Sequence, residues 1–310
     1  MTALPYIAPD PIQIVGALKL QPFGICVAVG MFIGIWYCRK NTDIDDATFR
    51  AYAWWLLLPG WFIGAHLFNA LFYEFDAVKE DPLLLFKFWR GISSYGGMLG
   101  ALAGFLIFTH RRKLSRLKMA DIPAYGLLPA WAFGRLGCSL VHDHPGRLTD
   151  FFLAIDYPAN NPTLAALGLP GGPRHDLGFY EFLYLVVAFG IFLLLTRKPR
   201  PDGFAIGVVA LLYAPVRFLL EFLRIQGTDP RYVGLTFAQW MCIVLATAGA
   251  CILIYAYRRA GERAQQFAAE VDGPEKAAPA TKATKKSTGH GTAATKKSTG
   301  HQNKPRKKKK

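Results

Sequence analysis

Charged side chains stand inside two of the most apolar stretches of this sequence. Arg135 follows the run Trp-Ala-Phe-Gly, and Arg217 and Glu221 lie within the apolar stretch 213–224. An arginine at the centre of a membrane helix costs about 3 kcal/mol on insertion scales, so it usually faces a cavity, a charged partner or a polar ligand. Because the planar guanidinium group can bind two phosphate oxygens at once, this chemistry favours a phospholipid headgroup.

The two arginines are expected at the same depth. Arg135 precedes the end of its apolar stretch at Val141 by six residues, and Arg217 precedes Arg224 by seven. At a rise of 1.5 Å per residue, both guanidinium groups would lie roughly 10 Å below the membrane surface. We therefore expect them to hold one anion together.

One helix face carries the polar residues around Arg217. Tyr213, Arg217, Glu221 and Arg224 are spaced by 4, 4 and 3 residues, which places them on the same side of a helix. Glu221 can pair with either arginine and fix its rotamer. The alternative interpretation is a set of internal ion pairs that only stabilise a helical bundle.

Two further polar clusters flank apolar stretches. His142 and His144 enclose Asp143, a pattern that could bind a metal ion with His175 as a further ligand. Since the sequence supplies no other clear ligand, we predict no metal and favour a hydrogen-bonding role. Elsewhere, the glycines of Tyr95-Gly96-Gly97 would let a ligand approach the backbone closely. The alternative role for Tyr95 is that of an aromatic side chain at the membrane interface.

The elements that must position these side chains are long apolar helices. Of the 310 residues, 52% are hydrophobic and only 18% are charged, whereas soluble domains carry about 25% charged residues. Stretches of about 20 apolar residues are typical of transmembrane helices. We predict an all-α integral membrane protein with about seven such helices, at 16–37, 52–73, 95–110, 122–141, 179–196, 204–223 and 235–257.

The placement of lysine and arginine predicts the orientation of these helices. Basic residues cluster at 39–40, 110–118 and 196–200 and are scarce in the intervening loops. Because basic loops face the cytoplasm, we expect the N-terminus outside and the C-terminus inside the bacterial inner membrane. The segment 142–178 would then form a small extracytoplasmic cap.

The C-terminal segment differs in composition from the rest. The net charge of +15 arises mainly after residue 257, where 15 basic and four acidic residues occur, and the sequence Ala-Thr-Lys-Lys-Ser-Thr-Gly-His appears twice. We predict a membrane domain at 1–258 and a disordered cytoplasmic tail at 259–310. Such a basic tail suits anionic lipids or nucleic acid as partners.

Several short motifs, taken in order, resemble those of the bacterial prolipoprotein diacylglyceryl transferases. The likeness covers most of residues 12–258. It rests on residues 88–91 and 95–100, Gly134-Arg135-Leu136-Gly137, Arg174-His175 followed by Phe179-Tyr180-Glu181, and the segments 198–203 and 217–224.

This resemblance implies a function. Members of the family transfer diacylglycerol from phosphatidylglycerol to the lipobox cysteine of a preprolipoprotein, form a thioether and release glycerol phosphate. They act at the outer leaflet of the inner membrane among membrane lipids and use no known cofactor. By position, Arg135 and Arg217 would hold the headgroup and stabilise the leaving phosphate. The residues expected to bind substrate are Gly96, Gly97, Asp143, His175, Glu181, Tyr213, Glu221 and Arg224.

The chain also departs from the family pattern. The family usually has histidine at Tyr95, asparagine at Cys138, tyrosine at Phe23 and arginine at His66. The family histidine has been proposed as the base for the incoming thiol, so Tyr95 would take that place here. His142 and His175 are the other candidate bases, and transfer without a base is the alternative, since two arginines would stabilise the thiolate and the leaving group.

Two other functions compete with this interpretation. A divergent paralogue would keep the lipid pocket but bind phospholipid only, or transfer to another acceptor. A membrane transporter is less favoured, because the sequence shows no convincing internal repeat or matching pair of interrupted helices.

Overall fold

The chain folds mainly into helices. The computed structural model describes residues 3–272, except 16, 17, 88–90, 92, 226, 228 and 229. Residues 1–264 form one compact unit, and residues 265–310 are assigned to a second. The basic repeats lie outside the described residues, so their disorder stays a prediction. Residues 259–272, which the prediction counted in the tail, form the end of helix α10.

The helices follow the predicted apolar stretches. They are α1 (Pro22–Lys40), α2 (Asp46–Trp55), a π-helical segment (Leu56–Phe62), α3 (Ile63–Phe72), α4 (Phe75–Glu80), a 3-10 helix (Pro82–Phe86), α5 (Ser94–Arg111), α6 (Arg116–Val141), α7 (Pro162–Ala166), α8 (Leu177–Leu195), α9 (Phe204–Leu220), a 3-10 turn (Glu221–Leu223) and α10 (Phe237–Asp272). Each of the seven predicted stretches contains a helix.

Five helical segments among the described residues are long and apolar enough to cross a membrane, judged by length and composition. They are Pro22–Lys40, Asp46–Phe72, Leu177–Leu195, Phe204–Leu223 and Phe237–Phe267. The predicted start of the first stretch at residue 16 was wrong. Residues Leu18–Leu20 form strand β2, and the helix begins at Pro22, whose fixed φ suits the first helical position.

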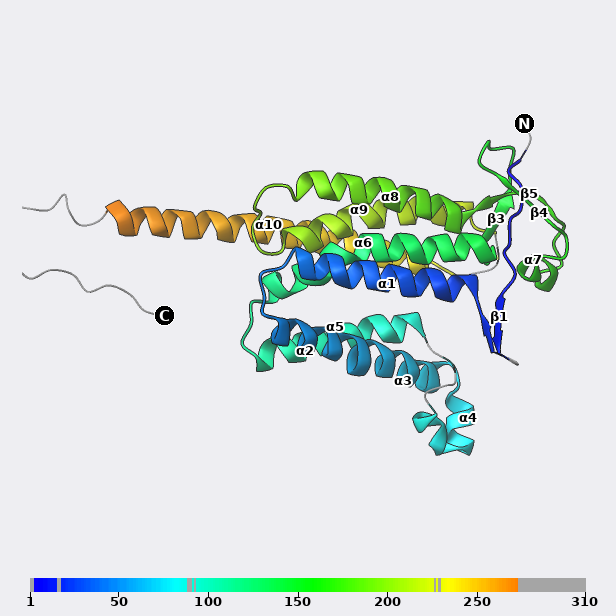
Figure 1. Ribbon diagram of the computed structural model, residues 1–310, viewed down its shortest axis with the longest axis horizontal. Coiled ribbons are helices and arrows are strands. Elements are labelled where there is room, and N and C mark those ends of the chain that lie inside the picture. Colours follow the sequence, from blue (N-terminus) through cyan, green and yellow to red (C-terminus); the bar gives the residue numbers. More distant parts are fainter. Residues whose placement is uncertain are drawn as a thin grey trace, which may run out of the picture. The chain divides into compact units, whose positions relative to one another are not determined.

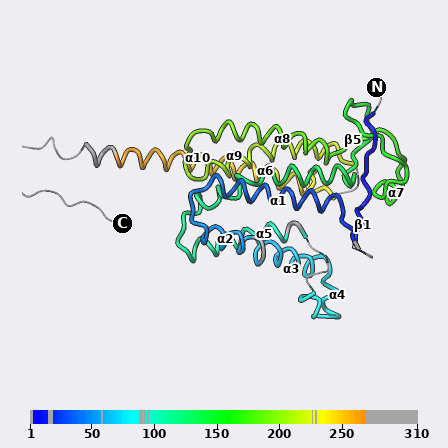
Figure 2. The backbone as a smooth tube through the Cα atoms, viewed as in Figure 1, coloured from blue at the N-terminus to red at the C-terminus, as the bar shows by residue number. Residues whose placement is uncertain are grey.

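Helix α6 lies at the centre of the described helices. It packs against α1, α8 and α9, whereas α5 packs mainly against α3 and the π-helical segment. Figure 1 and the backbone trace in Figure 2 show α1, α6, α8 and α9 side by side, with α2, α3 and α5 forming a neighbouring group. The main apolar core joins α6, α8 and α9 through buried residues that include Leu128, Leu185, Phe192 and Val209.

Side-chain caps fix where the three central helices begin. The Ser115 side chain accepts a hydrogen bond from Lys118 N at 3.4 Å at the start of α6. Asp176 caps α8 by accepting from Phe179 N at 2.8 Å. The start of α9 is held by Asp121 of α6, which accepts from Gly203 N at 2.7 Å and from Ile206 N at 2.9 Å. These caps satisfy orphan amide groups and fix the relative positions of the helices that carry the site.

The segment predicted as a cap contains a small sheet that the all-α prediction did not foresee. Its strands are β3 (Pro145–Leu148), β4 (Ile155–Tyr157) and β5 (Gly172–Asp176), in the antiparallel order β3-β5-β4. The N-terminal arm, residues 3–11, contacts the cap, because Leu4 bridges to Ile155. The arm and the cap therefore lie at the same end of the helices (Figure 1). Two hairpins complete the fold, β1 (Ile12–Val15) with β2, and β6 (Arg231–Tyr232) with β7 (Leu235–Thr236).

Glycines allow α1 and α6 to approach closely. A Cβ atom at Gly126 would lie 2.6 Å from Cys38 Sγ and closer still to the Gly34 carbonyl oxygen. Alanine at Gly126 is therefore expected to lower the free energy of unfolding by about 1–3 kcal/mol. Thermal unfolding in detergent micelles measures this, with Gly134→Ala in the same helix as the matched control, because nothing lies within 4 Å of a Cβ there. Equal unfolding temperatures for Gly126→Ala and Gly134→Ala would contradict the packing argument.

Candidate active site

The carboxylate of Glu181 joins the two arginines that the sequence singled out. Arg135 Nε of α6 lies 3.0 Å from Glu181 Oε1 of α8. Arg217 Nε of α9 lies 3.7 Å from Glu181 Oε2. Glu181 is only 3% exposed. Three different helices thus bring both guanidinium groups onto one buried carboxylate, although the arginines are far apart in sequence.

Two further donors converge on the same carboxylate. The Tyr213 hydroxyl donates to Glu181 Oε1 at 2.7 Å, and Trp131 Nε1 donates to the same oxygen at 3.3 Å. The Trp131 ring also lies 5.5 Å from the guanidinium carbon of Arg135, within the range of a cation–π contact. The sequence analysis did not select Trp131, but its spacing of four residues from Arg135 on one helix was a usable signal.

Glu221 pairs with both arginines of its helix face, as the spacing indicated. Its Oε2 lies 2.5 Å from Arg217 Nη1, and its Oε1 lies 2.9 Å from Arg224 Nε. Glu221 sits in the 3-10 turn that follows α9, and its side chain is 2% exposed. The carboxylate therefore fixes the rotamer of Arg217 through Nη1, whereas Glu181 faces its Nε.

The charges of this cluster do not cancel. Three guanidinium groups, from Arg135, Arg217 and Arg224, face the two carboxylates of Glu181 and Glu221, which leaves one positive charge among these five side chains. The Arg135 and Arg217 side chains remain 15% and 13% exposed. Because an uncompensated charge in a desolvated site is costly, the cluster is suited to hold a singly charged anion such as a phosphodiester.

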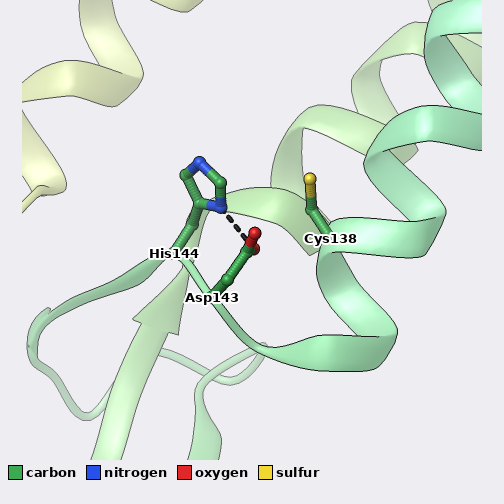
Figure 3. Close-up of side chains that lie close together, drawn as sticks. All are labelled: Cys138, Asp143 and His144. Atoms are coloured by element: carbon green, nitrogen blue, oxygen red, sulfur yellow. Dashed lines mark hydrogen bonds and ion pairs between the residues drawn. The ribbon is translucent and has the colours of Figure 1, made fainter. Parts of the chain in front are cut away.

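A second group of side chains gathers beside Arg135. Arg135 Nη1 lies 3.9 Å from Cys138 Sγ. Cys138, Asp143 and His144 place one potential ligand atom each within 4.8 Å of one another, and Figure 3 shows the carboxylate of Asp143 hydrogen-bonded to the His144 ring. This group differs from the His-x-His set considered from sequence. It offers three potential ligands, whereas structural zinc sites use four.

His142 turns away from this group and into the cap. Its Nδ1 lies 2.7 Å from Asp176 Oδ2, and its Nε2 lies 3.2 Å from the Ile7 carbonyl oxygen. Tyr157 OH donates to the same Asp176 oxygen at 2.9 Å. Both ring nitrogens of His142 are thus engaged by oxygen atoms of the cap and of the N-terminal arm. His142 therefore ties the N-terminal arm to the cap.

His175 lies in strand β5, which leads directly into α8. Its Nδ1 is 3.0 Å from Tyr180 OH, which itself donates to the Leu153 carbonyl oxygen at 3.3 Å, so Nδ1 is the donor and Nε2 keeps its lone pair. Burial, together with the nearby charge of Arg147, lowers the pKa of His175. The ring is therefore neutral near neutral pH.

The family model described as prolipoprotein diacylglyceryl transferase matches residues 9–255 of the chain. The chain belongs to the prolipoprotein diacylglyceryl transferase family. Similar relatives are named phosphatidylglycerol–prolipoprotein diacylglyceryl transferase. The protein from Chromohalobacter salexigens is 31% identical over 84% of this chain and 97% of its own length. The protein from Azotobacter vinelandii is 30% identical over 83% of this chain and 97% of its own length. The protein from Pseudomonas aeruginosa is 30% identical over 81% of this chain and 94% of its own length.

The structure shows what surrounds His66 and Phe23, two residues that depart from the prolipoprotein diacylglyceryl transferase pattern. His66 is 2% exposed, and its Nε2 lies 3.2 Å from the Leu84 carbonyl oxygen, so it joins α3 to the 3-10 helix that follows α4. Phe23 packs against α6, where a Cβ at Gly137 would lie 3.0 Å from its ring.

The Tyr95-Gly96-Gly97 segment occupies the start of α5. The side chain of Tyr95 lies outside the described residues. A Cβ at Gly97 would lie 2.5 Å from Trp61 Nε1, and one at Gly96 would meet Phe68 and the Gly64 carbonyl oxygen. Helix packing against α3 and the π-helical segment therefore accounts for both glycines in this prolipoprotein diacylglyceryl transferase family member, and their binding of substrate stays a prediction.

Proposed function

We propose that the chain transfers diacylglyceryl from phosphatidylglycerol to the lipobox cysteine thiol of a prolipoprotein. The observation that carries this proposal is the convergence of Arg135 and Arg217 on Glu181, in a cluster with one excess positive charge. The names of the relatives support the choice of phosphatidylglycerol and prolipoprotein as substrates.

In the proposed reaction, the cysteine thiolate attacks the glycerol carbon that bears the phosphate. The new carbon–sulfur bond replaces the carbon–oxygen bond, glycerol phosphate leaves with the bonding electrons, and the thiol proton passes to a base, to the leaving phosphate or to water. The guanidinium groups of Arg135 and Arg217 stabilise the negative charge that builds on the phosphate. The same groups favour the thiolate, since a thiol with a pKa near 8.5 is mostly protonated at neutral pH.

The remaining members of the cluster position these arginines. Glu181 forms ion pairs with Arg135 and Arg217 and accepts a hydrogen bond from Tyr213, and Glu221 holds Arg217 and Arg224. With their oxygens engaged, the two carboxylates are suited to hold guanidinium groups in a fixed orientation and not to move protons.

If a base takes the thiol proton, two candidates are supported. Tyr95 stands where the family usually has histidine, and His175 keeps a lone pair on Nε2. The variants Tyr95→Phe and His175→Gln separate them in the assay below, because only removal of the true base slows transfer. Full activity of both variants would support transfer without a base.

We further propose seven transmembrane helices, with the N-terminus and the cap outside the bacterial inner membrane and the active site toward the outer leaflet. The N-terminal arm and the cap share one end of the bundle, and the loops 111–116 and 195–204 join helices at their other ends. The basic residues of those loops favour the cytoplasmic side. The tail would then contact anionic lipids or nucleic acid in the cytoplasm.

The proposal is tested with the purified full-length chain, phosphatidylglycerol and a lipobox peptide, and the product is read by mass spectrometry. We expect the peptide to gain one diacylglyceryl group, and the same peptide with serine for cysteine to gain none. Binding of phosphatidylglycerol without transfer would favour a divergent paralogue, which the substitutions at Tyr95 and Cys138 make the second candidate. Phospholipid flux into liposomes without transfer would instead indicate a transporter.

A further inference from the structure

A second basic site lies at the end of the helices away from the cap. A cavity of about 300 Å³ opens between the α8–α9 loop and α10, and Arg200, Asp202, Arg259 and Arg263 line it. Three guanidinium groups against one carboxylate leave two positive charges around the cavity. This surplus fits a phosphate group, which guanidinium groups bind through paired hydrogen bonds.

The arginines of this cavity come from two parts of the chain and converge. Arg259 and Arg263 are four residues apart in α10, so they lie on one face. Arg200 is anchored from the other side, because its Nε donates to the Leu195 carbonyl oxygen at 3.0 Å and its guanidinium carbon lies 4.9 Å from the Phe204 ring. An anchored arginine loses less conformational entropy when it binds an anion.

The cavity lies where the apolar surface of the bundle ends. Helix α8 ends at Leu195 and α9 begins at Phe204. In α10, the apolar stretch gives way to Arg258 directly after Tyr255 and Tyr257, which are 54% and 49% exposed. Tyrosines collect at the interface between hydrocarbon and headgroups. This position favours a phosphate that belongs to a lipid over a phosphate from solution.

The cavity is separate from the arginine cluster of the active site. Arg200 precedes the first turn of α9, and Arg217 lies in its last turn. At 1.5 Å per residue, the 13 residues from Phe204 to Arg217 span about 20 Å. A lipid headgroup cannot occupy both places, so a ligand here would be a second one.

We propose that this cavity binds the phosphate headgroup of an anionic phospholipid in the leaflet opposite the active site. Basic pockets between membrane helices are suited to such headgroups. The inference depends on the membrane placement of α8, α9 and α10 and not on the transfer reaction. Its failure would leave the proposed function untouched.

Arginine-specific labelling with phenylglyoxal, read by peptide mass spectrometry, tests the site on the full chain in detergent micelles. We expect phosphatidylglycerol to slow the labelling of Arg259 and Arg263 about tenfold, and phosphatidylcholine to leave it unchanged. Arg111 and Arg112, which lie in another basic loop, are the internal controls. Equal protection by inorganic phosphate would overturn the lipid assignment in favour of a soluble anion, and no protection by phosphatidylglycerol would remove the site.

A pair of variants gives an independent readout. Arg259→Lys with Arg263→Lys keeps the charge that orients the helices but removes the paired donors. We expect native mass spectrometry to show one phosphatidylglycerol fewer on this double variant than on the wild-type chain, with unchanged transfer to the lipobox peptide. Arg111→Lys with Arg112→Lys is the matched control. Equal lipid counts for both double variants and the wild-type chain would contradict the proposal.

Discussion

Alanine at Arg135 or at Arg217 is expected to lower the rate of thioether formation about 10²–10³-fold, while the protein still folds. Each arginine supplies one of the two guanidinium groups that meet at Glu181. Without either one, the charge on the leaving phosphate and on the thiolate loses its nearest counter-charge. Mass spectrometry of the lipobox peptide at a series of times measures the rate.

Two further substitutions sharpen this test. Arg217→Lys keeps the positive charge but loses the planar fork, so we expect an intermediate rate. Arg231→Ala is the matched control, because Arg231 is exposed and donates only to the Gly234 carbonyl oxygen among the contacts described. Transfer at the wild-type rate by both alanine variants, Arg135→Ala and Arg217→Ala, would exclude the two arginines as the headgroup clamp.

Glutamine at Glu181 is expected to destabilise the protein by about 3 kcal/mol and to slow transfer. This substitution keeps the size of the side chain but removes the negative charge that Arg135 and Arg217 share. Breaking a buried ion pair by removing one partner leaves an uncompensated charge. We expect kcat to fall more than KM rises, because the arginines would still attract the headgroup but would no longer be held for the leaving phosphate.

Thermal unfolding and transfer kinetics on one preparation separate the two effects. Glu80→Gln serves as the control, since Glu80 is exposed at the end of α4. A positioning role also predicts that Glu181→Asp, which keeps the charge, restores stability more fully than activity. Wild-type stability together with wild-type kcat in Glu181→Gln would show that the arginines are oriented without this carboxylate.

The sequence by itself determined the local features of the site. Apolar stretches of the right length located all seven segments that contain the main helices. The spacing of Arg217, Glu221 and Arg224 predicted the two ion pairs found around Glu221. Such pairs depend on local spacing, because residues three or four apart in a helix or a helical turn lie on the same side.

Only the tertiary structure decided which residues meet across helices. The resemblance placed Arg135, Arg217, Glu181 and Tyr213 in one site, but local spacing did not indicate that Glu181 would be the carboxylate they share. Nor did it indicate that Cys138 would join Asp143 and His144, or that Gly96 would pack against Phe68. The strands of the cap were missed because 142–178 has no alternating apolar pattern. These contacts depend on how each helix is rotated and how deeply it packs, and that is set by the summed close packing of many side chains, not by local spacing.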